Sequence, residues 1–233
     1  MIKIFQFTDR GSRENNEDSI KTFENPDFTA ACVADGVGGQ KCGKLASETV
    51  VEFFAERVES FETDLQNIIN KAHERVKSLQ NENLECKSMA TTFTGCMING
   101  LILKGIHIGD SRLCILRGNG IKQLTESHTE VIRLVKNKKL RIEDVETYPR
   151  KHILESAIGV NGELLVQRFE FNLEVADRIL LTSDGVHDII TKVEFRDLSK
   201  KTSEIKKFGD SIIKLLSQKK IQDNISFIIL ELQ

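Results

Sequence analysis

Carboxylates stand at the ends of several apolar segments of this sequence. In three places an aspartate lies beside a glycine, and in two more an aspartate or an acidic pair comes directly before an apolar segment. These residues are Asp35 with Gly36, Asp110 after Gly109, Asp184 before Gly185, Asp223, and the pair Glu17 and Asp18. A single Asp-Gly pair is typical of a turn. A turn does not require an acid at all five sites, so the set as a whole favours a chemical role for these carboxylates over a role in turns.

Carboxylates that converge repel one another, and a bound cation relieves that repulsion. We therefore expect a metal site. No histidine or cysteine occurs with zinc-ligand spacing, so the ligands would be carboxylate, carbonyl and water oxygens, which suit ions such as Mg²⁺ or Mn²⁺. Gly36 fits this interpretation, because a residue without a side chain lets its carbonyl oxygen approach an ion closely.

The apolar segments are short, rich in Val, Ile, Phe and Thr, and closed by Gly, Asn or Asp, which predicts antiparallel strands. Helical spacing occurs in separate stretches between them. The expected strands are 2–8, 18–23, 28–34, 92–99, 101–108, 113–117, 164–171, 178–182 and 225–232, and the expected helices are 44–61, 65–80, 129–145 and 192–217. This order predicts an α+β fold in which helices cover the outer faces of stacked sheets. The polar stretch 80–88 is expected to be a surface loop.

Composition limits the class of protein. At 233 residues, with 39% hydrophobic and 29% charged residues, the chain suits one globular domain. A net charge of -2 argues against nucleic acid or an anionic membrane as a partner. The sequence has no bilayer-length apolar run and no signal-peptide pattern at its start, which predicts a cytoplasmic protein. Five cysteines, without a Cys-x-x-Cys pair, are expected to be reduced and buried.

Five blocks of the sequence, taken in order, resemble the metal-dependent protein phosphatases of the PPM family, type 2C, in their compact bacterial form. The blocks are Arg13 with Asn16, Glu17 and Asp18; Asp35 with Gly36, Gly38 and Gly39; Gly109 to Arg112; Ser183 to Gly185; and Asp223 with Asn224. They cover nearly the whole chain. The resemblance implies a single catalytic domain over residues 1–233, built as a four-layer α-β-β-α sandwich of two antiparallel sheets flanked by helical pairs.

The resemblance also implies a binuclear centre of two Mn²⁺ or Mg²⁺ ions at one end of the sandwich. Asp35 would bridge both ions, and Asp184 and Asp223 would hold the first. Glu17 and the Gly36 carbonyl would hold the second.

Three further residues receive roles in the same way. Asp18 would support the ligands from behind, and Asp110, together with Asp184, matches the position of a third, weaker ion. Arg13 would grip the substrate phosphate through its planar guanidinium group. The two ions would activate one shared water, and the resulting hydroxide would attack phosphoserine or phosphothreonine on a protein.

The chain departs from the family pattern in two places. Val37 stands where animal members have a histidine that is a candidate general acid, and Ser156 stands where bacterial relatives usually have arginine. His187, near Asp184, is expected to be structural rather than a replacement acid. Thr91, Thr92 and Thr94 are interpreted as sheet packing.

Residues 124–159 correspond to the family's flap beside the active site, and the resemblance is loosest there. The flap has a basic character that could receive acidic or phosphorylated segments, although a solvated surface is the default interpretation. Its basic residues are Lys136, Lys138, Lys139, Arg141, Arg150 and Lys151.

Alternative functions stay open at this point. The same fold could be a catalytically weak or inactive binding module. Loss of Asp35, Asp184 or Asp223 would favour that alternative, but all three residues are present. A different oxygen-ligated metallohydrolase, such as a nuclease, or a purely structural sandwich explains the residues less well. The preferred interpretation is a monomeric phosphatase whose partners are phosphorylated targets of a serine/threonine kinase.

Overall fold

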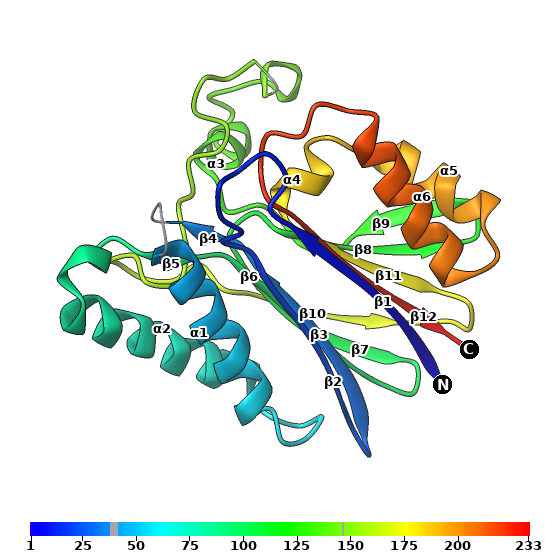
Figure 1. Ribbon diagram of the computed structural model, residues 1–233, viewed down its shortest axis with the longest axis horizontal. Helices are drawn as coiled ribbons and strands as arrows, with labels where there is room; N and C mark the ends of the chain where they lie inside the picture. Colours follow the sequence, from blue (N-terminus) through cyan, green and yellow to red (C-terminus); the bar gives the residue numbers. More distant parts are fainter. Residues whose placement is uncertain (38–41, 146) are drawn as a thin grey trace.

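Two five-stranded antiparallel sheets pack face to face in the computed structural model, and helices cover both outer faces (Figure 1). The structure describes residues 1–37, 42–145 and 147–233. The predicted α+β sandwich is confirmed. Gly38 and Gly39, which belong to one of the five sequence blocks, lie outside the described residues.

The first sheet joins the two ends of the chain. β1 pairs with β12 over its whole length, from Ile2 opposite Leu232 to Asp9 opposite Ile225. Figure 1 accordingly shows the two termini side by side. In spatial order the strands are β1 (Ile2–Asp9), β12 (Ile225–Leu232), β11 (Arg178–Thr182), β8 (Arg112–Arg117) and β9 (Gly120–Gln123).

The second sheet contains β3, a strand that is buried on both faces. Its alternate side chains enter two different cores: Ala31 and Val33 lie between the sheets, whereas Cys32 and Ala34 pack towards the helices. A small ladder of β4 (Gly36–Val37) and β5 (Ala90–Thr91) adjoins it. In spatial order the main strands are β10 (Gln167–Asn172), β7 (Ile102–Ile108), β6 (Phe93–Asn99), β3 (Phe28–Ala34) and β2 (Ser19–Asn25).

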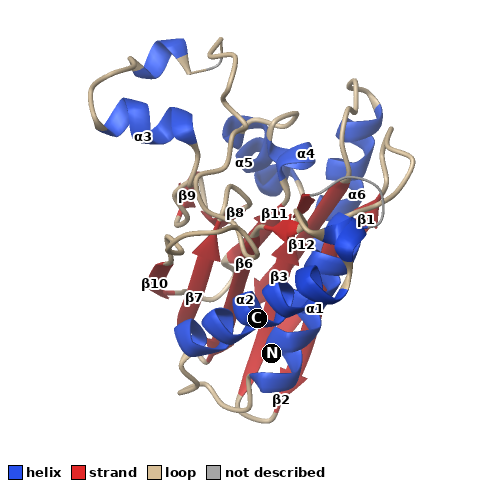
Figure 2. Cartoon of the chain, turned by 90° about the vertical axis from the view of Figure 1, so that its left-hand side faces the viewer, coloured by secondary structure: helices blue, strands red, loops and turns tan. Residues whose placement is uncertain are grey.

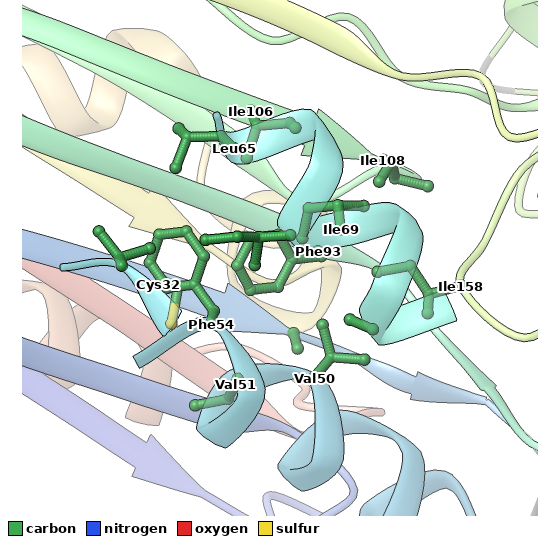
Figure 3. Packing of buried hydrophobic residues seen from close by; sticks show 14 of the residues in the cluster. Cys32, Val50, Val51, Phe54, Leu65, Ile69, Phe93, Ile106, Ile108 and Ile158 are labelled. Carbon is green, nitrogen blue, oxygen red and sulfur yellow. The ribbon is translucent and has the colours of Figure 1, made fainter. Parts of the chain in front are cut away.

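Three hydrophobic layers hold the sandwich together. One lies between the second sheet and the helices α1 (Cys42–Arg57) and α2 (Leu65–Glu82), where Phe54 and Phe93 pack with ring centroids 5.0 Å apart (Figure 3). The middle layer fills the space between the sheets. The third lies under α4 (Asp184–His187), α5 (Lys192–Lys201) and α6 (Ile205–Ser217). In the described ranges no helix is long and apolar enough to cross a membrane.

The predicted extents of two helices were wrong. The stretch 129–145 forms only the short α3 (Glu130–Lys136) and the 3₁₀ turn η2 (Ile142–Asp144), which stand out beyond the strand ends in Figure 2. Lys138 between them has a φ of 57°, a left-handed conformation that stops an α-helix. The stretch 192–217 is likewise two helices, because α5 ends before Thr202 and α6 begins at Ile205.

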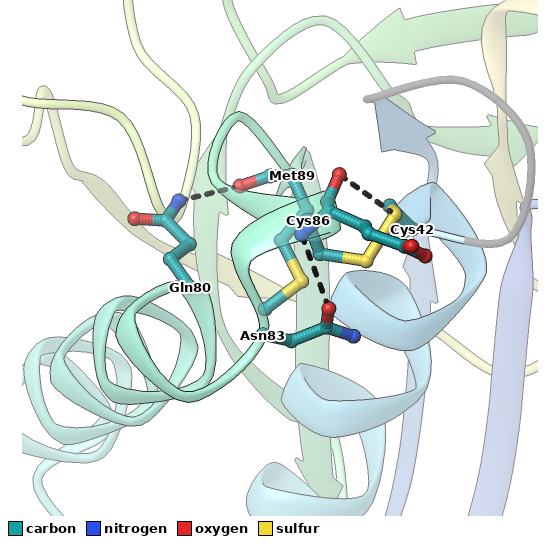
Figure 4. Close-up of a disulfide and its surroundings, with 6 residues drawn as sticks. Cys42, Gln80, Asn83, Cys86 and Met89 are labelled. Atoms are coloured by element: carbon teal, nitrogen blue, oxygen red, sulfur yellow. Dashed lines mark hydrogen bonds between the residues drawn. A yellow bond between two sulfur atoms is a disulfide. The ribbon is translucent and has the colours of Figure 1, made fainter.

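The expectation that all five cysteines are reduced was wrong for two of them. Cys42 and Cys86 form a disulfide with a Cα–Cα distance of 5.3 Å, which links the start of α1 to the 3₁₀ turn η1 (Leu84–Cys86) (Figure 4). The pairing arises because α1 and α2 are antiparallel neighbours, and residues far apart in sequence carry no local spacing signal for it. The expected surface loop 80–88 therefore contains a buried, covalently anchored residue. Cys32, Cys96 and Cys114 are free and buried, as expected.

Candidate metal centre

The predicted site residues converge from both sheets at one end of the sandwich. They stand where β3, β7 and β11 end and where β2 and β12 begin, and the antiparallel register aligns these ends, with Ser19 opposite Ala34 and Thr182 opposite Phe227. A cavity of about 430 Å³ lies there. Its lining includes Arg13, Glu17, Asp35, Gly36, Val37, Thr92, Asp110, His152, Leu154, Asp184, Asp223 and Asn224. Among the residues assigned from the sequence, Asp18 alone does not line it; this side chain lies behind the cavity and is 1% exposed.

Thr92 fixes the backbone of Asp35. The Thr92 hydroxyl accepts a hydrogen bond from the Asp35 N–H at 3.0 Å, and the Thr92 N–H donates to the Asp35 carbonyl at 2.9 Å. The Thr91 hydroxyl donates to the same carbonyl at 2.9 Å. The sheet-packing role predicted for these threonines from the sequence does not include this positioning of Asp35. The position of Thr92 just before a buried strand was the only available signal.

Asn224 holds the segment that carries Glu17. Its side-chain oxygen accepts a hydrogen bond from the Glu17 N–H at 2.8 Å, and its amide group donates to the carbonyls of Arg10 and Asn15 at 2.9 and 2.8 Å. The residue after Asp223 therefore ties the start of the last strand to the loop between β1 and β2. It brings carboxylates more than 200 residues apart in sequence to one site.

The first turn of α1 supports Glu17 and Gly36 from the other side. The Gly43 N–H donates to the Glu17 carboxylate. A Cβ atom at Gly43 would lie 2.8 Å from Glu17 Cδ, and one at Gly36 would lie 2.2 Å from the Gly43 carbonyl oxygen. Only glycine fits at both positions, because each backbone passes directly against the other.

Asp18 is held by the strand that leads to Asp184. The Ser183 hydroxyl donates to Asp18 Oδ2 at 2.8 Å. Arg13, on the open side of the cavity, donates from Nη2 to Asp223 Oδ2 at 2.7 Å and from Nε to the Gln222 carbonyl at 3.1 Å. These bonds orient the guanidinium group at the cavity mouth, where its side chain remains 57% exposed.

Burial and mutual repulsion disfavour ionisation of these carboxylates. Burial raises the pKa of Asp110 to about 8 and that of Asp18 to about 7, and the charge of Asp184 adds to both shifts. Burial, reinforced by the charges of neighbouring aspartates, also holds the pKa of Asp35 well above its ordinary value. Such a cluster is costly without cations, because each charge is removed from water and faces others of the same sign.

Three carboxylate oxygens of the cluster have no hydrogen-bond donor among the described residues. They are Glu17 Oε1, Asp18 Oδ1 and Asp184 Oδ1, and all are buried from solvent. Buried polar atoms almost always have a hydrogen-bond partner, so we expect these oxygens to bind something other than a protein donor. Oxygen-only donors of this type suit Mg²⁺ or Mn²⁺, and the residues present therefore fit the expected ions.

The flap contributes two residues to the cavity that the sequence analysis did not single out, His152 and Leu154. Ser156, at the departure from the family's arginine, is 1% exposed, and its hydroxyl accepts a hydrogen bond from the Leu165 N–H at 2.9 Å. Its contact is thus structural. His187 is also buried, with Nδ1 2.9 Å from the Thr182 hydroxyl, which agrees with the expected structural role.

Ion pairs within the flap occupy several of its basic residues. Lys136 pairs with Glu126, Arg141 with Asp144, and Arg150 with Glu130. Such exposed pairs contribute little to stability, and they reduce the positive charge that the flap presents. These contacts favour the default interpretation of a solvated surface.

Comparison with known proteins identifies the family. A family model described as protein phosphatase 2C matches residues 8–227. The serine/threonine phosphatase stp of Listeria welshimeri is 31% identical over an alignment of length 235. The alignment covers 96% of this chain and 93% of that protein. The chain belongs to the protein phosphatase 2C family.

Solved structures agree with this family assignment. A serine/threonine phosphatase of S. agalactiae has a TM-score of 0.92 and 27% identity, with 100% of both chains covered. The catalytic domain of the phosphatase PstP, in complex with two manganese ions, has a TM-score of 0.83 and 25% identity, with 99% of this chain and 97% of that chain covered. This protein phosphatase 2C member therefore has solved relatives over its full length, one of them with manganese bound.

Proposed function

We propose that this protein phosphatase 2C member hydrolyses phosphoserine and phosphothreonine on proteins in a metal-dependent reaction. The observation that carries the proposal is the group of buried carboxylate oxygens that have no hydrogen-bond donor among the described residues. These oxygens lie in or directly behind one cavity, which an exposed arginine also lines. The relatives named as serine/threonine phosphatases, and the manganese-bound neighbour, support the same activity. No contact in the described residues favours the inactive alternative.

The proposed ligands are those that the resemblance to the family implies, and all of them line the same cavity. Asp35 would bridge two ions, Asp184 and Asp223 would hold one, and Glu17 with the Gly36 carbonyl would hold the other. Asp110 and Asp184 would share a third, weaker ion. Bound Mn²⁺ or Mg²⁺ would supply a hydroxide nucleophile near neutral pH and neutralise charge on the phosphoryl group.

The chain's own residues bind and orient the substrate. The Arg13 guanidinium would donate to phosphate oxygens in a planar fork, while Asp223 keeps that fork at the cavity mouth. Asn224 and Thr92 hold the backbones of Glu17 and Asp35, so the site is organised before substrate arrives. Val37 has no proton to donate, and water in the cavity is the proposed proton source for the leaving serine or threonine oxygen.

Several finer features belong to the same proposal. Residues 1–233 would form one catalytic domain with the flap at 124–159. Its substrates would be targets of a serine/threonine kinase, and the protein would act as a cytoplasmic monomer without nucleic-acid or membrane partners. The modest net charge of -2 supports the last point.

The test is hydrolysis of a phosphothreonine peptide by purified protein with Mn²⁺, and then with excess chelator. We expect turnover that chelator abolishes and that Asp184→Asn lowers by at least about a hundredfold. Asp210→Asn, at an exposed position of α6, is the matched control and should keep full activity. Turnover that survives in chelator, or in Asp184→Asn, would contradict the proposal.

A further inference from the structure

We propose that a second cavity beside the metal centre receives an acidic residue of the substrate, and that Lys220 pairs with its carboxylate. The inference rests on the proposed function, because it concerns the peptide around the same phosphate. It assigns a specificity-determining residue and a substrate class. The substrates would be phosphopeptides with an aspartate or glutamate close to the phosphorylated serine or threonine.

The second cavity has a volume of about 720 Å³ and continues directly from the metal centre. Arg13, His152, Asp184 and Asp223 line both cavities, so a peptide whose phosphate lies at the metal centre can extend into the second one. The rest of its lining comes from the flap, from α4 and the residues after it, and from the connection between α6 and β12. These residues are Lys151, Gly185, Asp188, Ile189, Lys220 and Gln222.

The backbone around Lys220 is held in place by the residues on either side of it. Lys219 Nζ donates to the Ile189 carbonyl at 2.8 Å and pairs with Glu194 at 2.7 Å. Ile221 packs against the hydrophobic layer under α4, α5 and α6. The connection between α6 and β12 accordingly passes beside α4 in Figure 1. Lys220 therefore has a fixed place at the cavity, although its side chain is exposed.

The ammonium group of Lys220 has no acidic partner in the part of the chain that the structure describes. Its neighbour Lys219 pairs with Glu194, and Arg13 pairs with Asp223. A lysine ammonium is a compact charge on a flexible stem, so it can turn towards a carboxylate that enters the cavity. Such a carboxylate would gain an ion pair without displacing an acid of the protein.

The ions expected at the metal centre change the balance of charge in this cavity. Asp184 and Asp223 are proposed metal ligands, so bound cations would offset their negative charge. Asp188 is the other acid of the lining, and its Oδ2 lies 3.5 Å from His152 Nδ1. An acidic side chain of the substrate should therefore be attracted towards Lys220 and repelled near Asp188.

The position of Lys220 in the chain limits where the acidic residue can lie in the substrate. Lys220 stands three residues before the proposed ligand Asp223, so their Cα atoms are at most about 11 Å apart. An extended peptide advances about 3.3–3.6 Å per residue, so this distance corresponds to about three residues at most. We therefore expect the acidic residue within about three positions of the phosphorylated residue.

The test compares phosphothreonine peptides that carry either aspartate or asparagine at one of the three nearest positions on either side. With Mn²⁺, kcat/KM of the wild type should be about two- to fivefold higher for the aspartate peptide at one or more positions, as expected for an exposed ion pair. That ratio should approach one in Lys220→Gln, persist in Lys220→Arg and fall below one in Lys220→Glu. Each ratio is taken within one variant, so a change in catalytic rate cancels. Salt should reduce the wild-type preference.

Lys214→Gln is the matched control, because it makes the same change of charge at an exposed position of α6 that lines neither cavity. It should keep the wild-type ratio. A wild type that hydrolyses these peptides without preferring aspartate at any position would overturn this inference alone. So would a preference that Lys220→Gln leaves unchanged, or that Lys214→Gln lowers equally. A wild type that hydrolyses none of the peptides in Mn²⁺ would overturn the proposed function as well.

Discussion

At the scale of single residues, the site depends on groups that never touch an ion. Thr92, Asn224 and Gly43 each hold the backbone or carboxylate of a proposed ligand through one or two hydrogen bonds. A ligand that is free to move loses entropy when it binds, whereas one that is already held does not. Metal affinity should therefore be sensitive to these supporting contacts.

Thr92→Val tests this dependence with a change of similar volume. It removes the hydroxyl that accepts from the Asp35 N–H and leaves a buried donor unsatisfied, which should lower the free energy of unfolding by about 1–3 kcal/mol. Mn²⁺ affinity, measured by calorimetric titration, should fall as well. Thr94→Val is the control, because the Thr94 hydroxyl bonds His107 instead; it should destabilise the fold while Mn²⁺ affinity stays unchanged. Equal losses of affinity in both variants would contradict the positioning role of Thr92.

Gly43→Ala tests the close approach of α1 to the site. The added methyl group would lie 2.8 Å from Glu17 Cδ and 2.9 Å from the Gly36 carbonyl carbon, so it must displace a proposed ligand. We expect at least about tenfold weaker Mn²⁺ binding, although alanine favours a helix over glycine by roughly 1 kcal/mol. Gly120→Ala, where the added carbon meets nothing closer than 3.4 Å, should leave binding unchanged. An unaltered Mn²⁺ titration in Gly43→Ala would show that α1 does not set the position of Glu17.

At the scale of elements, α1 is anchored at its start by a covalent bond. Cys42 is the first residue of α1 and is bonded to Cys86, and the next residue, Gly43, contacts Glu17 and Gly36. The disulfide therefore fixes the helix turn against which two proposed ligands rest. Its effect should reach both stability and metal binding.

Reduction of the disulfide should lower the free energy of unfolding by about 2–4 kcal/mol, because the bond closes a loop with a sequence separation of 44. Thermal unfolding with and without reductant measures this change, and a Mn²⁺ titration in each state should show weaker binding after reduction. The double variant Cys42→Ser, Cys86→Ser is the control and should not respond to reductant. The cytosol keeps most thiols reduced, so the reduced state matters for the cytoplasmic location proposed above. A wild type that is insensitive to reductant would contradict the expected anchoring.

At the scale of the whole molecule, the sequence predicted the strand segments and the acidic residues of the site, but not the order of the strands in the two sheets. Strands such as β3 and β12 were recognisable because continuous apolar runs bounded by Asp or Gly predict buried strands. The acidic residues at their ends pointed to one site, and the structure brings them together. Their roles as individual ligands remain predictions.

The features that the sequence did not predict depend on long-range geometry. The Cys42–Cys86 bond joins residues with no spacing pattern, and α3 is shorter than its apolar periodicity suggested because the backbone at Lys138 turns left-handed. His152 has no motif around it, and only the folded flap places it near Asp188. Local patterns carry no information about such contacts between distant segments.

The proposed metal centre contains residues from the ends of both sheets, so its charge affects how the two sheets pack together. Glu17 and Asp35 adjoin the second sheet, Asp184 and Asp223 adjoin the first, and Asp110 lies in the connection between β7 of the second sheet and β8 of the first. Ions bound among them would oppose separation of the sheets. A ligand that binds only the folded state stabilises it by about 2.7 kcal/mol at a hundredfold excess over its dissociation constant.

The effect of pH on the stability that these carboxyls contribute without metal has a definite sign. In the chelated protein, burial raises the pKa of Asp18 to about 7 and that of Asp110 to about 8, above the value of about 4 expected for an unfolded aspartate. Between these values the folded state keeps protons that the unfolded state has released, so the contribution of these two carboxyls to stability falls as pH rises from about 4 to 8. Mn²⁺ competes with those protons, and its stabilising effect should therefore grow over the same range. Burial lowers the pKa of His107 to about 3 and that of His187 well below its ordinary value, so these histidines contribute in the opposite direction, but only below about pH 7.

Thermal unfolding between pH 5.5 and 8, in chelator and in Mn²⁺, checks both trends. The melting temperature in chelator should decrease between about pH 7 and 8, where the buried histidines are neutral in both states, and the difference between Mn²⁺ and chelator should increase. Asp110→Asn should flatten the chelator curve, because an amide at this position has no proton to lose. A chelator curve that rises between about pH 7 and 8, and that Asp110→Asn leaves unchanged, would mean that these carboxylates are ionised in the folded protein without metal.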